Sequence, residues 1–139
     1  MAGLASCVGF AAWPSLAALH DIDARHAPRA AALPRARIVN VGSGAGSHGD
    51  QDFGLSANPA AVSYAVSKAA LHALTAKLAA ELASDGITVV AADPGLTATA
   101  PGMEAMGARP IDDGARSILT AAIADDTATF TRDGQPLPW

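Results

Sequence analysis

Tyr64 and Lys68 stand four residues apart and could share acid–base chemistry. On an α-helix, side chains at this spacing lie on one face and can reach a common ligand. A free tyrosine is a poor acid or base at neutral pH, and a neighbouring ammonium favours its phenolate form. The pair is therefore a candidate site for proton exchange, provided that a helix carries it.

Ser43 is the third candidate, because it follows a short β-branched run that ends at Gly42. Its hydroxyl could hydrogen-bond a substrate oxygen while Tyr64 exchanges a proton with that oxygen. The substrate carbon would then give or receive a hydride, which no side chain can supply, so a cofactor is required. Together these residues indicate oxidoreductase chemistry.

The elements around these residues alternate between strand and helix. Residues 35–42 and 87–92 are apolar, β-branched runs ended by glycine or proline, which predicts buried strands of a parallel sheet. The Gly-rich residues 43–58 between them predict a long functional loop. Such a strand–loop–helix–strand unit is a right-handed crossover, and ligands bind at the carboxyl ends of its strands, where Ser43 and Thr97 fall.

Residues 59–84 form the strongest predicted helix, with Pro59 at its start and Gly86 after its end. Its apolar residues recur every fourth position, at Val66, Ala70, Leu74, Leu78 and Leu82. A second helix should begin at a cap on Asp112 or Asp113 and run to Ala124, with an apolar face of Ile118, Leu119, Ala122 and Ile123.

The two ends of the chain are less regular. Residues 1–34 are rich in Ala and show no sustained hydrophobic period, so this segment remains poorly assigned. Residues 35–139 form a separate unit. A short strand is predicted over residues 128–131, followed by a turn at Arg132-Asp133-Gly134. Trp139 is expected to pack as an apolar plug against the domain or a partner subunit.

Composition excludes several classes of function. The 139 residues allow one domain, and a net charge of −4 without a basic stripe argues against nucleic acid or an anionic membrane as a partner. No apolar run reaches the ~18 residues of a membrane span. The single cysteine, Cys7, allows no internal disulfide and no zinc site, so we expect a cytoplasmic protein without a metal.

Three segments in order resemble successive signatures of the short-chain dehydrogenase/reductase family. They are residues 37–46 (RIVNVGSGAG), 64–71 (YAVSKAAL) and 93–99 (DPGLTAT). The resemblance spans residues 35–139, and residues 130–139 are similar to the tails of carbonyl-reductase-like members. It implies an α/β fold that is the C-terminal half of a Rossmann-type, doubly wound parallel sheet.

The resemblance also implies roles for the candidate residues. Ser43 matches the substrate-orienting serine, Tyr64 the catalytic acid/base, and Lys68 the residue that assists the tyrosine and holds the nicotinamide ribose. The loop against the nicotinamide and its phosphates matches Pro94, Gly95 and Thr99, with Thr97 ranked behind Thr99. The implied partners are NAD or NADP and a small carbonyl or alcohol substrate, and residues 59–84 are the candidate interface of a homo-oligomer.

The chain departs from the family pattern in three places. Nothing before Arg35 resembles the Thr-Gly-x-x-x-Gly-x-Gly turn that receives the pyrophosphate. The only asparagines, Asn40 and Asn58, do not match the asparagine of the catalytic tetrad. Gly42 stands where the family usually has a serine, and Ser47 is the alternative to Ser43 if the loop is threaded differently.

Two other functions stay open. Without the first βαβ unit, the chain could be a non-catalytic remnant or an oligomerisation module that does not bind the cofactor. The other is a serine hydrolase built on Ser47 with His48 or His72, although the loop does not turn from strand straight into helix as a nucleophile elbow does. A lone histidine on an amphipathic helix is expected at the surface or a partner contact, and His72 is interpreted in that way.

Overall fold

A computed structural model describes residues 36–59 and 61–139, so the interpretation of residues 1–34 lies outside the described part. One sheet has the order β1-β2-β3-β4. Its strands are β1 Arg37–Val41, β2 Thr88–Ala92, β3 Phe130–Arg132 and β4 Gln135–Pro136. The β1–β2 and β2–β3 pairs are parallel, whereas β3 and β4 pair antiparallel. The predicted α/β class is confirmed, and so are the strands predicted over residues 35–42 and 87–92, which are β1 and β2.

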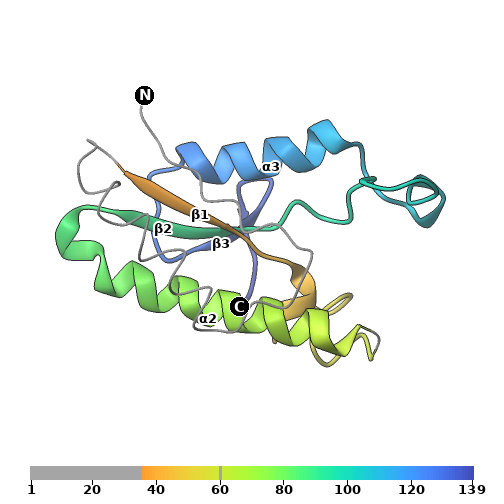
Figure 1. The fold of residues 1–139 in the computed structure, drawn as a ribbon, viewed down its shortest axis with the longest axis horizontal. Coiled ribbons are helices and arrows are strands. Elements are labelled where there is room, and N and C mark those ends of the chain that lie inside the picture. Colours follow the sequence, from red (N-terminus) through yellow and green to blue (C-terminus); the bar gives the residue numbers. More distant parts are fainter. Residues whose placement is uncertain (1–35, 60) are drawn as a thin grey trace.

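The sheet lies between two helices, which gives three layers (Figure 1). Successive strand side chains point to opposite faces, so β1 sends Ile38 to one core and Val39 to the other. Helix α2, Val62–Glu81, covers the Ile38 face through Leu78 and Ala79. Helix α3, Ile111–Ile123, covers the Val39 face.

Helix α2 is shorter than predicted, and its buried face agrees with the predicted one only toward its C-terminal end. It begins at Val62 instead of residue 59, because Ala61 has a φ of 53° and breaks the helical backbone. A 3-10 turn, Ala83–Asp85, follows, and Gly86 ends that turn. Residues spaced by four drift about 40° around a 3.6-residue helix at each step. As a result Val66 is exposed whereas Leu78 and Leu82 are buried.

Helix α3 also differs from its prediction. Pro110 precedes its first turn and no side chain caps it, so Asp112 and Asp113 lie inside the first turn and do not act as the cap. Ile118 and Ala122 pack on the sheet as predicted. The prediction is wrong for Leu119 and Ile123, which are 63% and 75% exposed. The residues buried in their place are Gly114, Ser117 and Ala121.

The C-terminal hairpin contains the predicted turn. Asp133 and Gly134 have φ values of 53° and 77°, the paired positive values of a tight type I′ hairpin turn. The strand before it begins at Phe130 and not at residue 128, because Ala128 has a φ of 54° and is not extended. The antiparallel strand β4 was not predicted.

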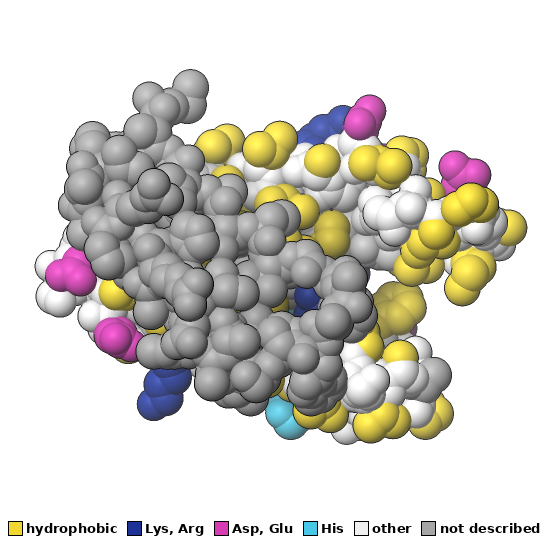
Figure 2. Space-filling view, viewed as in Figure 1, with side chains coloured by type: hydrophobic (Ala, Val, Ile, Leu, Met, Phe, Trp, Pro, Cys, Tyr) yellow, Lys and Arg dark blue, Asp and Glu magenta, His cyan; other side chains and the backbone are white. Residues whose placement is uncertain are grey.

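Exposed hydrophobic side chains are visible along the outer side of α3 and on the loop beyond it (Figure 2). They include Ile111, Leu119 and Ile123 of the helix and Met106 of the loop. Among the described helices, none has the length and apolar character needed to cross a bilayer.

Candidate functional site

A cavity of about 440 Å³ lies beside the ends of β1 and β2, where parallel strands are expected to present a ligand site. It is lined by the turn and loop after β1, the start of α2, the loop after β2 and Arg132 of β3. Six residues predicted from the sequence line this one cavity, namely Ser43, Tyr64, Pro94, Gly95, Thr97 and Thr99.

Ser43 lines this cavity and is held in place by its own turn. It caps the 3-10 turn Gly44–Gly46, and its Oγ accepts a hydrogen bond from the Ala45 amide at 3.3 Å. Its backbone amide donates to Nε2 of His72 at 3.4 Å. The hydroxyl is therefore placed by local backbone and by a contact from α2.

Lys68 lies behind Tyr64 on α2 and is anchored to the sheet. The Lys68 side chain is almost fully covered, and its Nζ donates to the Val41 carbonyl oxygen at 2.8 Å. The same Nζ lies 5.6 Å from the centre of the Tyr64 ring. The predicted i, i+4 pair is thus brought together, with Tyr64 toward the cavity and Lys68 between it and β1.

The loop after β2 presents backbone and small side chains to the cavity. Gly95 has a φ of 69°, a region that favours glycine, and a Cβ there would lie 3.2 Å from Arg109 Cδ. Thr97 Oγ1 donates within its own loop, 3.1 Å from both the Pro94 and Gly95 carbonyl oxygens. Thr99 Oγ1 lies 3.6 Å from the sulfur of Met103. Both threonines line the cavity, and the hydroxyl of Thr97 is already engaged with carbonyl oxygens of its own loop.

His72 is buried, which corrects its interpretation as a surface residue. It is only 3% exposed, and its ring centre lies 4.2 Å from that of Phe130 and 5.6 Å from that of Trp139. A Cβ on Gly42 would lie 2.8 Å from His72 Nε2 and 2.9 Å from Phe130. Gly42, which departs from the family pattern, is therefore the residue that leaves room for the imidazole. Trp139 packs on the domain through His72 and Phe130, as expected.

Burial lowers the pKa of His72 to about 4, a shift that Lys68 reinforces and Asp93 opposes. Between pH 6.5 and about 4 the unfolded chain binds more protons at this imidazole than the folded chain does. We therefore expect the free energy of unfolding to fall as the pH falls through this window. Urea unfolding at several pH values measures it, and His72→Gln, which cannot titrate there, should show a flatter dependence. An identical slope in both proteins would contradict the assignment.

Ser47, the alternative serine, has a structural role. It is fully buried, and its Oγ donates to the Pro138 carbonyl oxygen at 2.7 Å while accepting from the amides of Gly49 and Asp50, both at 3.0 Å. His48 is exposed, and among the described residues no hydrogen bond joins its side chain to Ser47. The geometry therefore favours Ser43 over Ser47 and disfavours the serine hydrolase.

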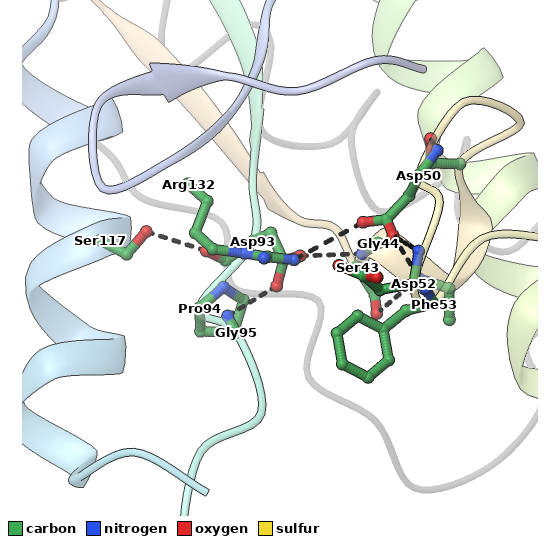
Figure 3. Close-up of polar contacts among 12 residues, drawn as sticks. Ser43, Gly44, Asp50, Asp52, Phe53, Asp93, Pro94, Gly95, Ser117 and Arg132 are labelled. Carbon is green, nitrogen blue, oxygen red and sulfur yellow. Dashed lines mark hydrogen bonds and ion pairs between the residues drawn. The ribbon is translucent and has the colours of Figure 1, made fainter. Parts of the chain in front are cut away.

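A polar network at the cavity was missed by the sequence analysis (Figure 3). Arg132, at the end of β3, donates from Nη2 to Asp93 Oδ2 at 2.6 Å and lies 3.9 Å from Asp50 Oδ2. Asp93 and Arg132 both line the cavity. No sequence motif links residues this far apart, and the only available signal was that each stands at the end of a predicted strand.

Comparisons with known proteins agree with the family resemblance seen in the sequence. A family model described as short chain dehydrogenase matches residues 26–108. No curated protein matches the chain.

Among solved structures, the carbonyl reductase Sniffer of D. melanogaster is 26% identical with a TM-score of 0.61, over 88% of this chain and 50% of that one. An NADPH-bound carbonyl reductase from chicken fatty liver is 26% identical with a TM-score of 0.67, over 89% and 52%. RhlG of Pseudomonas aeruginosa, solved as an active-site complex with NADP, is 25% identical with a TM-score of 0.63, over 95% and 65%. The chain spans about half the length of the two carbonyl reductases, and the partial Rossmann-type sheet is confirmed.

Proposed function

Since this chain belongs to the short chain dehydrogenase family, we propose that it carries the catalytic part of an NAD(P)-dependent oxidoreductase acting on a carbonyl/alcohol pair. One observation carries the proposal: Ser43, Tyr64 and the 94–99 loop line a single cavity, with Lys68 directly behind the tyrosine. Solved relatives bound to NADPH, to NADP and, in a 4-hydroxyisoleucine dehydrogenase, to NADH support NAD or NADP as the cofactor.

The cavity residues fit the nicotinamide end of such a cofactor. Pro94, Leu96 and Met103 offer apolar surface to a flat ring, and Gly95 lets backbone approach without a side chain. The hydroxyl of Tyr64 and the ammonium of Lys68 are groups that would hold ribose hydroxyls, and Thr99 lines the same cavity. When bound, the nicotinamide supplies or accepts the hydride that the side chains cannot.

The chain's own residues then manage the proton and the substrate oxygen. In the reductive direction, the Ser43 hydroxyl donates a hydrogen bond to the carbonyl oxygen and polarises it. As the carbon gains its hydride, Tyr64 gives its proton to that oxygen and an alcohol results. Lys68 stabilises the resulting phenolate, and its bond to the Val41 carbonyl holds the ammonium in place.

The proposal is tested by mixing the protein with NADPH or NADH and a panel of small aldehydes and ketones. We expect calorimetric binding of at least one nucleotide and its oxidation with at least one carbonyl compound. A soluble protein that neither binds a nucleotide nor turns over a carbonyl would refute this function and favour the non-catalytic oligomerisation module.

We further propose that the protein acts in the cytoplasm as a homo-oligomer joined through α2. The outward side of that helix carries exposed apolar residues, with Val62 and Val66 67% and 50% exposed. Ala73, Ala76 and Ala80 continue this exposed side toward the C-terminal end, where their small side chains would allow close approach of a second helix.

For this interface, Val66→Glu is expected to shift the protein from oligomer to monomer, because a charge would be buried against the partner helix. Size-exclusion chromatography with light scattering measures the molar mass. Leu119→Glu, which changes an exposed apolar residue of α3, is the matched control and should leave the mass unchanged. A monomeric wild-type protein would contradict the proposal.

A further inference from the structure

The carboxylate of Asp93 joins two walls of the cavity. Its Oδ2 accepts the Gly44 amide at 2.8 Å, one residue after Ser43, and its Oδ1 accepts the Gly95 amide at 2.6 Å. Asp93 is only 3% exposed, so water does not compete for these bonds. One buried side chain thus fixes the turn that carries Ser43 against the loop that carries Gly95.

The backbone of Asp93 is held as firmly as its side chain. Its amide donates to the Thr131 carbonyl oxygen at 2.8 Å, and its carbonyl accepts from Ser117 Oγ on α3 at 2.8 Å. Ser117 Oγ in turn accepts the Asp133 amide at 2.8 Å. The carboxylate therefore projects from a backbone fixed by both β3 and α3, which makes it a rigid spacer.

Arg132 supplies the charge that stabilises this carboxylate and extends the network to a third wall. Its guanidinium lies between Asp93 and Asp50 (Figure 3). Asp50 Oδ1 accepts the amides of Asp52 and Phe53 at 3.0 and 2.8 Å, and Phe53 lines the cavity. A Cβ on Gly44 would lie 2.5 Å from Asp50 Oδ2, so glycine leaves room for the network.

We propose that Asp93, paired with Arg132, is a positioning residue that sets the distance between the Ser43 turn and the Pro94–Gly95 loop. The inference rests on the proposed function, in which Ser43 orients the substrate oxygen and the Pro94–Gly95 loop supports the nicotinamide. Hydride transfer depends steeply on the separation of the reacting atoms, so a change in this distance lowers the rate. Both oxygens of Asp93 already accept from protein donors, Oδ1 from Gly95 and Oδ2 from Gly44 and Arg132, which supports a role in holding the loops.

The test is Asp93→Asn. Asparagine keeps the size but replaces one carboxylate oxygen with an NH₂ group, so it cannot accept from both Gly44 and Gly95 while also meeting Arg132. We expect amide hydrogen exchange, followed by NMR, to become about tenfold faster at Gly44 and Gly95 together, while the core amide of Val90 is unchanged. With NADPH and a carbonyl substrate, kcat should fall on the order of tenfold with little change in KM. Asp85→Asn, an exposed carboxylate in the turn after α2, is the matched control and should change neither readout.

The outcomes separate this inference from the function on which it rests. Unchanged exchange at either glycine would overturn it, and so would faster exchange with an unchanged kcat, since Asp93 would then be structural only. A wild-type protein without turnover would instead refute the proposed function, while the exchange contrast still decides whether Asp93 joins the loops. If Asp93→Asn does not fold, Arg132→Lys, which keeps the charge but loses the planar guanidinium between the two carboxylates, should free the same two amides together.

Discussion

Replacing Tyr64 by Phe is expected to lower kcat for NAD(P)H-dependent carbonyl reduction by ~10²–10⁴-fold, the usual contribution of a general acid. Phenylalanine keeps the ring that faces the cavity and removes only the hydroxyl that would protonate the substrate oxygen. The ring also keeps its place 5.6 Å from the Lys68 ammonium. Steady-state kinetics with NADPH and a carbonyl substrate measure the loss, which should fall on kcat far more than on KM.

Thr120→Val is the matched control for the loss of a hydroxyl outside the cavity. Thr120 does not line the cavity, and its hydroxyl donates to the Arg116 carbonyl oxygen of the same helix, so kcat should change little. Both variants should keep the circular dichroism spectrum of the wild type. If Tyr64→Phe turned over at the wild-type rate, the proton would come from another group and the assigned role of Tyr64 would be wrong.

The features that the sequence predicts well are those written in short, local patterns. β-Branched runs ended by Gly42 and by Asp93-Pro94-Gly95 predict strands at nearly their observed positions. Because parallel strands present their carboxyl ends at one edge, the same patterns predict that Ser43 and the 94–99 loop meet. The four-residue spacing of Tyr64 and Lys68 places the other two groups beside them.

The features that it misses depend on contacts between distant segments. His72 looks like a surface histidine from its helix, and only Phe130, Trp139 and the missing side chain of Gly42 create the space that buries it. The Asp93–Arg132 pair joins residues 39 positions apart, on strands whose pairing no local pattern specifies. The outward positions of Leu119 and Ile123 follow from how α3 is rotated on the sheet, which hydrophobicity alone does not fix.

A second large effect is expected at Gly46, where the turn after β1 crosses α2 at close range. A Cβ on Gly46 would lie 2.5 Å from the Ala69 amide nitrogen and from the Lys68 carbonyl carbon. Both atoms belong to helix backbone and cannot rotate away, so the turn and the helix must separate. We expect Gly46→Ala to lower the free energy of unfolding by ~1–3 kcal/mol, the usual cost of overpacking, as measured by urea unfolding.

Gly86→Ala separates this steric effect from backbone strain. Gly86 has a φ of 69° with open space around its Cβ position, so alanine there meets only the cost of a left-handed backbone, ~1 kcal/mol. Because Gly86 lies away from the cavity, its variant should keep the wild-type kcat. Gly46→Ala should lower kcat as well as stability, since the displaced turn carries Ser43 on one side and presses on the backbone of Lys68 on the other. If Gly46→Ala kept wild-type kinetics, the turn would be able to move off α2 without shifting Ser43, and the close contact would not position the site.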